Sequence, residues 1–108
     1  MDSTKVLGQL SPAAATLSDL YAVPALTNTT ASSIVICNHN NTSVTVRVAV
    51  AVGGAADDPE QYLYYDLPVS DNDTFIATIG ITLGPADVVR VYASATGVSF
   101  NLFGVEVS

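Results

Sequence analysis

A thiol and an imidazole two residues apart are the nearest thing in this sequence to a reactive pair. Cys37 is the only cysteine and His39 the only histidine among the 108 residues. On a strand they would share one face, as a nucleophile and its base or two metal ligands would require. A nucleophilic thiol normally draws its base from a separate element, and a free cysteine is usually a small core residue. We therefore expect a buried Cys37 beside a loop His39, with no catalytic role.

Carboxylates gather in two short segments that could offer oxygen ligands to calcium. The first segment holds Asp57, Asp58 and Glu60, and the second holds Asp71 and Asp73. A Ca²⁺ site needs about six to eight oxygens, and neither segment continues into the glycine and distal glutamate of an EF-hand loop. Aspartate is also favoured in solvated turns. The sequence therefore predicts exposed turn carboxylates, no metal site and no cofactor.

No other spacing in the chain matches a catalytic signature. A glycine-rich loop between a strand and a helix, which would hold phosphate, is absent. Ser, His and Asp are not arranged as in a known hydrolase, and turn acids alone do not make the paired carboxylates of a glycosidase. We therefore expect a protein that is not an enzyme.

Three tyrosines stand close together in an expected strand and suit binding better than catalysis. Simple alternation places Tyr62 and Tyr64 on one face, with Leu63 and Tyr65 on the other. One face should lie on the core, so the other presents tyrosine to a subunit contact. Local packing, with the hydroxyl in water, explains them almost as well. The residues proposed as interface candidates are Tyr62, Tyr64, Tyr65, Val6 and Leu10.

The element that must organise these residues is a valine-rich segment at residues 43–52. Valine recurs there at every second position, which is the period of a strand. The apolar face comprises Val44, Val46, Val48, Val50 and Val52, and the other face comprises Thr45, Arg47, Ala49 and Ala51. We expect a long strand whose valine face packs on the core.

Turn signals divide the remainder into further short strands. They are expected at residues 5–10, 16–23, 33–38, 61–67, 74–82, 88–93 and 98–107, with Phe75, Ala77, Ile79 and Ile81 on one face and a bulge at Gly104. Residues 39–42 resemble a hairpin loop, so segments 33–38 and 43–52 are expected to pair antiparallel at the centre. No segment has a 3.6-residue period. The fold class predicted is all-β: a single β-sandwich or jelly-roll-like domain of seven or eight antiparallel strands.

Length and composition predict one domain with partners. We expect residues 1–15 to form an extended N-terminal arm or edge strand, and residues 16–108 to form the sandwich. The hydrophobic content is 49%, whereas only 12% of residues are charged. A small free-standing protein normally covers more of its surface with polar groups, so apolar surface should meet partner subunits. The many small Ala and Val residues leave a plain monomer as the alternative.

The charge balance excludes several classes of partner. Ten acidic residues against Lys5, Arg47 and Arg90 give a formal net charge of −7. Three scattered cations cannot replace the counterions of nucleic acid or hold an anionic membrane. With one cysteine no internal disulfide forms, which suits assembly in a reducing cytosol. No signal peptide or apolar run of about 20 residues is evident, so we expect no membrane association.

Two segments carry a resemblance to a known class of proteins. Residues 20–25 (LYAVPA) lead through a polar turn to residues 32–38 (SSIVICN) and then to the valine-rich segment. This order is similar to that of small β-sandwich structural proteins in the virions of tailed bacteriophages. Further similar segments lie at residues 64–66, 73–75, 87–91 and 99–104, so the resemblance spans most of the chain. These segments bear the fold and supply no catalytic residues.

The resemblance implies a virion component made in the host cytoplasm. It favours a capsid decoration (cement) protein on the outside of the head, which binds the major capsid protein and stabilises its lattice. A tail, neck or baseplate appendage that helps adsorption to the host is the alternative. One short domain without a coiled coil favours decoration. We expect a homodimer or homotrimer, with the N-terminal arm gripping an adjacent subunit.

Overall fold

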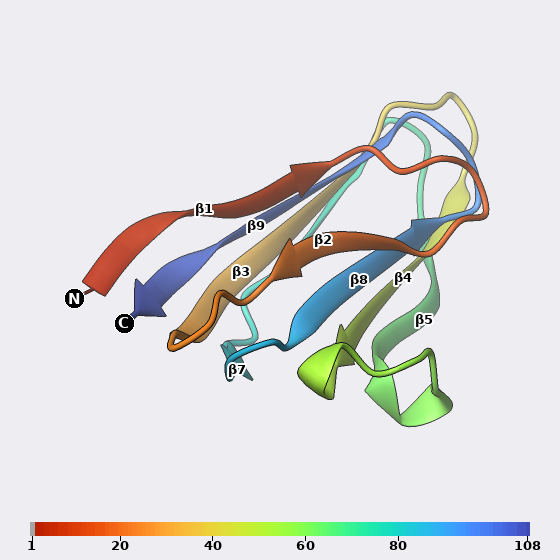
Figure 1. Ribbon diagram of the computed structural model, residues 1–108. Helices are drawn as coiled ribbons and strands as arrows, with labels where there is room; N and C mark the ends of the chain where they lie inside the picture. The colour runs from red at the N-terminus through yellow and green to blue at the C-terminus, as the bar shows by residue number, and fades with distance from the viewer. Residues whose placement is uncertain (1) are drawn as a thin grey trace.

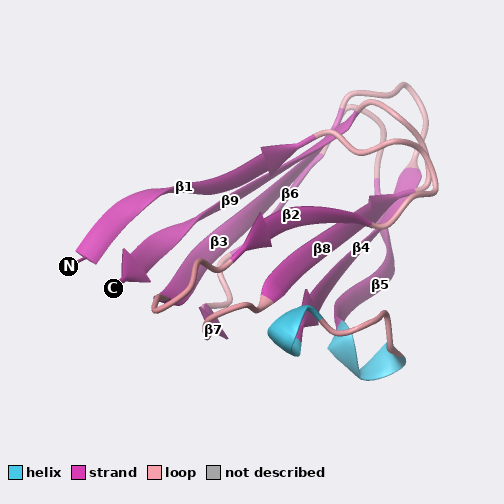
Figure 2. Ribbon diagram, viewed as in Figure 1, coloured by secondary structure: helices cyan, strands magenta, loops and turns pink. Residues whose placement is uncertain are grey.

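The structure is a computed structural model that describes residues 2–108, and it is built from strands. These are β1 (Asp2–Leu10), β2 (Ser18–Ala22), β3 (Asn28–Asn38), β4 (Val44–Ala51), β5 (Tyr62–Val69), β6 (Thr74–Ala77), β7 (Ile81–Leu83), β8 (Val88–Ala93) and β9 (Val98–Val107). Two 3₁₀ turns, η1 (Val52–Gly54) and η2 (Pro59–Gln61), lie between β4 and β5 (Figure 2). Within residues 2–108, no helix is long and apolar enough to cross a membrane.

The strands form two antiparallel sheets that pack as a sandwich (Figure 1). One sheet has the order β1-β9-β3-β6, with β7 also paired to β3, and the other has the order β2-β8-β4-β5. Neighbours in each sheet therefore come from distant parts of the chain, as with β1 and β9. This interleaved order is that of a jelly roll. The predicted all-β sandwich is confirmed.

The core lies between the two sheets and is made from the alternating apolar faces of the long strands. Val44, Val46 and Val48 of β4 are buried and face the inner residues of the opposite sheet, such as Ile36 and Phe100. Each such side chain contributes about 1.5–3 kcal/mol to folding relative to an exposed one. The predicted valine face is therefore confirmed as far as Val50, which packs partly against the core.

Val52 does not continue this face, because the strand has already ended. Val52 begins η1 and is 73% exposed. The next residue, Gly53, has a φ of 65°, which turns the chain out of the extended conformation. The prediction for Val52 was wrong because alternation in sequence outlasts the strand itself.

The predicted central hairpin is also wrong, since segments 33–38 and 43–52 lie in different sheets. The loop between them crosses from β3 to β4. Its geometry is fixed by Asn38, whose side chain is buried. Nδ2 donates to the carbonyls of Thr42, Val69 and Ser70, and Oδ1 accepts from the backbone N–H of Asn40. Polar turn residues thus support a crossing between sheets as readily as a hairpin.

A projecting N-terminal arm is not shown by the structure. Asp2–Leu10 form β1, which pairs antiparallel with β9 along its length. The alternative prediction for the N-terminal residues was an edge strand. It fits the structure, because β1 lies at the end of its sheet. The loop at residues 11–17 is anchored where the backbone N–H of Ala15 donates to Ala93. The N-terminal segment is part of the sandwich.

Two local expectations fail at glycines. Segment 74–82 is not one strand: it breaks at Gly80, whose φ is 65°, and Ile79 is 49% exposed. The predicted strand thereby divides into β6 and β7. The bulge expected at Gly104 lies instead in both neighbours of β9, at Leu7 in β1 and Ser32 in β3. A Cβ on Gly104 would come within 2.3 Å of the Thr30 carbonyl, so glycine permits this close approach.

Candidate functional site

Arg47 anchors a polar and aromatic cluster on the outer face of the β2-β8-β4-β5 sheet. Its Cζ lies 4.1 Å from the ring centroid of Tyr65 and 4.3 Å from that of Tyr92. Its Nε donates to Asp66 Oδ1 at 2.7 Å. Cation–π contact on two rings and a charge-assisted hydrogen bond hold the guanidinium in one position. The bond to Asp66 also raises the pKa of Arg47.

Two bulges in β5 place the tyrosines differently from simple alternation. Register shifts between Val46 and Val48, and between Val48 and Ala49, give β5 extra residues opposite β4. Asp66 has a φ of 52° at the first of these shifts. Each extra residue moves the following side chains to the opposite face. The two-by-two division of the tyrosines expected from the sequence is therefore wrong.

Tyr62 and Tyr65 share the outer face, whereas Tyr64 turns inward. The rings of Tyr62 and Tyr65 meet edge to face with centroids 5.0 Å apart. Tyr64 packs against the core and meets Phe75 edge to face at 5.3 Å. Leu10, another interface candidate, also packs against the core, whereas Val6 is 47% exposed. Of the five candidates, Tyr62, Tyr65 and Val6 therefore lie where a partner could reach them.

The loop at residues 52–61 folds over one end of the same outer face. Arg90 Nη1 and Nη2 donate to the carbonyls of Ala55 and Gly54, and Arg90 Nε donates to Asp19 Oδ1. Gln61 Nε2 donates to the Ala56 carbonyl at 2.8 Å. These bonds fix the loop to the sheet, and with it the carboxylates that the loop carries.

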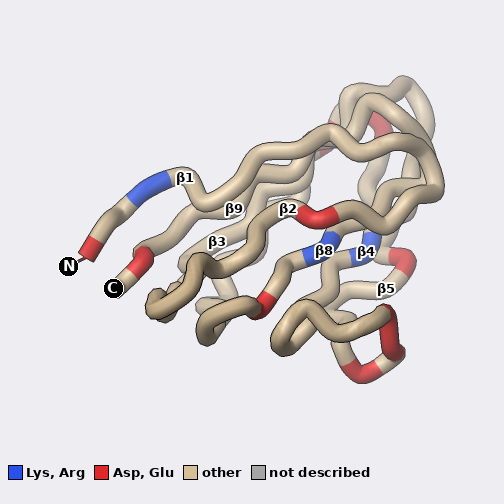
Figure 3. The backbone as a smooth tube through the Cα atoms, in the orientation of Figure 1, with Lys and Arg blue, Asp and Glu red and all other residues tan. Residues whose placement is uncertain are grey.

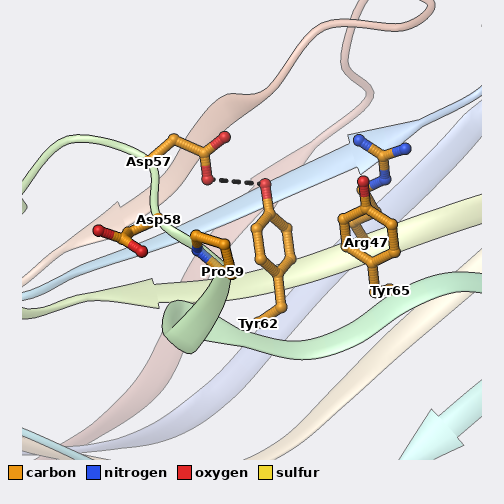
Figure 4. A pocket seen from close by; sticks show the side chains of 6 residues that line it. All are labelled: Arg47, Asp57, Asp58, Pro59, Tyr62 and Tyr65. Carbon is orange, nitrogen blue, oxygen red and sulfur yellow. Dashed lines mark hydrogen bonds between the residues drawn. The ribbon is translucent and has the colours of Figure 1, made fainter.

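A depression of about 600 Å³ lies between this loop and the tyrosines (Figure 4). We name it the Tyr62–Tyr65 depression, and its lining residues are Arg47, Asp57, Asp58, Pro59, Tyr62 and Tyr65. The hydroxyl of Tyr62 donates to Asp57 Oδ1 at 2.8 Å, as the dashed line shows. Partial burial, and then this hydrogen bond, raise the pKa of Tyr62. A hydrogen bond with Asp58 raises the pKa of Glu60 beside the depression.

The residues singled out as reactive from the sequence do not form a catalytic group in the structure. Cys37 is half-buried on the outer face of the other sheet, opposite Ser99 and Thr74, so the expectation of a buried core cysteine is not met. The ring of His39 is exposed, and its Nε2 lies 3.2 Å from Ser99 Oγ, within hydrogen-bonding distance. Among the described residues, no group of three or more His, Cys, Asp and Glu side chains is placed to hold a metal ion.

The outer face of the β1-β9-β3-β6 sheet has the opposite character. Away from the chain ends, its exposed or half-buried side chains include Val6, Gln9, Ser33, Val35, Cys37, Thr74, Ile76, Ser99, Asn101 and Phe103, which together we name the neutral face. None of these side chains is charged. Val6 is paired with Phe103, and Val35 with Ile76, so the apolar members are cross-strand neighbours. Ile76 is 63% exposed.

Charge is thus segregated in the molecule (Figure 3). Arg47, Arg90 and the carboxylates of the loop before β5 lie on or beside the second sheet, whereas the only charged residues of β1, β3 and β9 are Asp2, Lys5 and Glu106, near the chain ends. Sequence reasoning missed this division because register between distant strands decides which residues share a face. It also missed Arg47 as the centre of the aromatic cluster, although a single cation in a run of valines was a signal for it.

No family model matches the chain, and no curated protein matches it. The resemblance to phage virion proteins therefore rests on sequence segments alone, and the function that it implies stays a prediction. The jelly roll does not decide the function, since this architecture serves capsid, lectin and cupin domains alike. The features of the molecule that bear on its function lie on the two outer faces.

Proposed function

We propose that the protein is a non-enzymatic virion structural protein that docks through its neutral face onto the outside of a capsid. The proposed partner is the major capsid protein, and the role is that of a decoration (cement) protein. The observation that carries the proposal is the absence of charge among the residues of the neutral face, where exposed Ile76 and Val6 lie beside half-buried Val35 and Phe103. The phage context comes from the sequence resemblance.

The physical support is the match between this face and the centre of a protein interface. Interface centres are depleted of charged residues, and burying apolar area there drives association. The molecule measures 42 × 27 × 20 Å. Each broad face therefore offers on the order of 1,000 Å², close to what one partner contributes to a stable interface. Long strands also keep the face rigid, so little ordering entropy opposes docking.

The same face supports self-association as a homodimer or homotrimer when capsid is absent. Exposed apolar side chains in neighbouring strands favour contact between copies, because association removes them from water. Within a particle, where the capsid covers this face, contact with the capsid stabilises the assembled shell, since a ligand that binds only the assembled state shifts the equilibrium toward it.

The test is the temperature of genome release from particles that lack the protein. Adding the purified chain should raise that temperature, and Ile76→Lys, which puts a charge on the neutral face, should not. Tyr65→Ala, on the opposite face, is the matched control and should act as the natural chain does. Circular dichroism confirms that both variants are folded. An unchanged release temperature with the natural chain would contradict the proposal.

Immunolabelling of particles separates the capsid placement from the tail placement. Label over the head supports decoration of the capsid. Label confined to the tail, neck or baseplate contradicts decoration and supports an appendage that assists adsorption.

A further inference from the structure

We propose that the Tyr62–Tyr65 depression is a binding site for a neutral saccharide. It lies on the sheet opposite the neutral face, so it is available when that face is covered. The inference goes beyond the proposed docking function and does not depend on it.

Aromatic surface is the first feature that suits a sugar. Tyr65 is 59% exposed, and Tyr62 meets it edge to face, so two rings at nearly a right angle (88°) line the depression. The apolar C–H face of a pyranose packs on such rings, which bury large area at low entropy cost. The guanidinium of Arg47 lies against one face of Tyr65 and thereby fixes the ring (Figure 4).

Hydrogen-bonding groups of both kinds surround the rings. Arg47 uses Nε for Asp66, so its terminal nitrogens can donate to a ligand. Asp57 accepts from Tyr62 through Oδ1, and its second oxygen can accept from a ligand hydroxyl. Sugar hydroxyls both donate and accept, and therefore match donors and acceptors placed side by side.

The mixture of charges favours a neutral ligand over an ion. An anion would approach Asp57 and Asp58, with Glu60 and Asp66 close by, and be repelled. A cation would be attracted by these carboxylates, but inside the depression it would lie beside the guanidinium of Arg47, which two rings hold in place and which repels it at short range. A neutral polyhydroxyl compound suffers neither repulsion and can bond to both kinds of group.

The depression is also pre-organised, which lowers the cost of binding. Its loop wall is fastened by Arg90 to Gly54 and Ala55 and by Gln61 to Ala56. Its floor is formed by the paired strands β4 and β5, where the guanidinium of Arg47 packs on the rings of Tyr65 and Tyr92. The volume of about 600 Å³ accommodates one or two sugar rings, within the usual range of small-molecule sites.

The experiment is a titration of the full chain with soluble sugars, followed by tyrosine fluorescence and by amide chemical shifts. The sequence has no tryptophan, so fluorescence reports on its five tyrosines. The probes are tetrasaccharides of glucose, galactose, mannose and N-acetylglucosamine, compared with galacturonate and glucosamine oligomers of equal length. We expect at least one neutral probe to bind, with shifts at Tyr62 and Tyr65, and to bind more tightly than either charged oligomer.

Variants decide whether binding occurs in the depression. Tyr65→Ala should weaken binding about ten-fold or more through loss of stacking, and Asp57→Asn should weaken it while retaining the fold. Ile76→Lys should bind as the natural chain does. The proposal is overturned if no neutral probe shifts these residues, if a charged oligomer binds more tightly, or if Tyr65→Ala binds unchanged. Failure in this assay leaves capsid docking intact, and Ile76→Lys fails only in the docking assay.

Discussion

At the scale of single residues, Arg47 depends on geometry that lysine cannot supply. Its planar guanidinium stacks between Tyr65 and Tyr92 while Nε donates to Asp66. An ammonium group has no plane to stack and is more strongly hydrated. We expect Arg47→Lys to lower the free energy of unfolding by about 1 kcal/mol. Urea denaturation measures this loss of stability. Lys5→Arg, which exchanges one cation for the other at a site without ring contacts among the described residues, is the control. Equal stability of Arg47→Lys and the natural chain would show that stacking on the two rings does not stabilise the fold.

A second residue-scale network joins the two ends of the chain to β2. The hydroxyl of Tyr21 donates to Glu106 and shares a hydrogen bond with Thr29 at 2.9 Å, while Lys5 Nζ lies 2.8 Å from Glu106 Oε1. Burial, and then the bond to Glu106, raise the pKa of Tyr21 to about 12. The bonds from Lys5 and Tyr21 lower the pKa of Glu106 below its ordinary value of 4.5.

These two pKa shifts predict that the free energy of unfolding falls at both acid and alkaline pH. The Glu106 contribution is present above pH 4.5 and is lost as pH falls through its lowered folded pKa. The Tyr21 contribution is present below pH 10.0 and is lost as pH rises toward 12. Glu106→Gln should remove the Glu106 contribution to the loss of stability in acid, and Tyr21→Phe should reduce the loss in alkali, of which the raised pKa of Tyr62 leaves a part.

Urea midpoints across the pH range measure both losses of stability. At pH 7, Tyr21→Phe should also cost about 1–2 kcal/mol, because its partners lose a buried hydrogen bond. Tyr65→Phe, which loses only an exposed hydroxyl, is the control. A pH profile of Tyr21→Phe that matches the natural chain would show that the network does not act as described.

At the scale of strands, the packing around β9 depends on a missing side chain at Gly104. A Cβ there would lie 2.3 Å from the Thr30 carbonyl and 2.7 Å from Ala31 Cα, both in the backbone of β3. We expect Gly104→Ala to cost about 3 kcal/mol, since the central strand pair must separate. Gly80→Ala is the matched control, because its Cβ would meet nothing within 4 Å. Only the strain of a positive φ should then lower the free energy of unfolding, by about 1–2 kcal/mol. Equal losses in chemical denaturation would contradict the close-approach argument.

The sequence predicts strands where chemistry alternates locally, and it fails where distant partners decide. The alternation from Val44 to Val50 is a property of one segment, and the predicted strand with its inward valine face is confirmed. The predicted partner of that strand is wrong, because Asn38 directs the chain across the sandwich through hydrogen bonds to the carbonyls of residues 69 and 70. The bulges at Leu7 and Ser32 are likewise set by the approach of β9. Such features depend on register, which the residues of one strand do not contain.

For the candidate sites too, the sequence predicts features of one segment but not contacts that depend on register. The sequence predicts Tyr62, Tyr64 and Tyr65 as interface candidates, with Tyr62 and Tyr65 on opposite faces, whereas the structure places Tyr62 and Tyr65 on one outer face and Tyr64 against the core. Their role as a partner contact stays a prediction. Their neighbourhood with Arg47 and Asp57 follows from the bulges of β5 and from the fastened loop, neither of which has a sequence signature. Cys37 and Ile76 belong to one face only because β6 pairs with β3.

At the scale of the whole molecule, the sandwich separates an uncharged surface from a charged one. The net charge of −7 is carried outside the neutral face, by the loops, the second sheet and the chain ends. Copies that meet through their neutral faces therefore gain from apolar burial, while the rest of each molecule repels the other at long range. This division makes the response to salt informative.

We expect self-association to strengthen as salt is raised from about 20 mM to 500 mM, because screening shortens the range of the repulsion between like-charged copies. Sedimentation equilibrium measures the association constant at each salt concentration. Ile76→Lys should weaken association at both concentrations, because a lysine within the contact must be desolvated. Tyr65→Ala should behave as the natural chain does. Association that weakens with salt would mean that charged side chains make the contact, and the neutral face would then not be the interface.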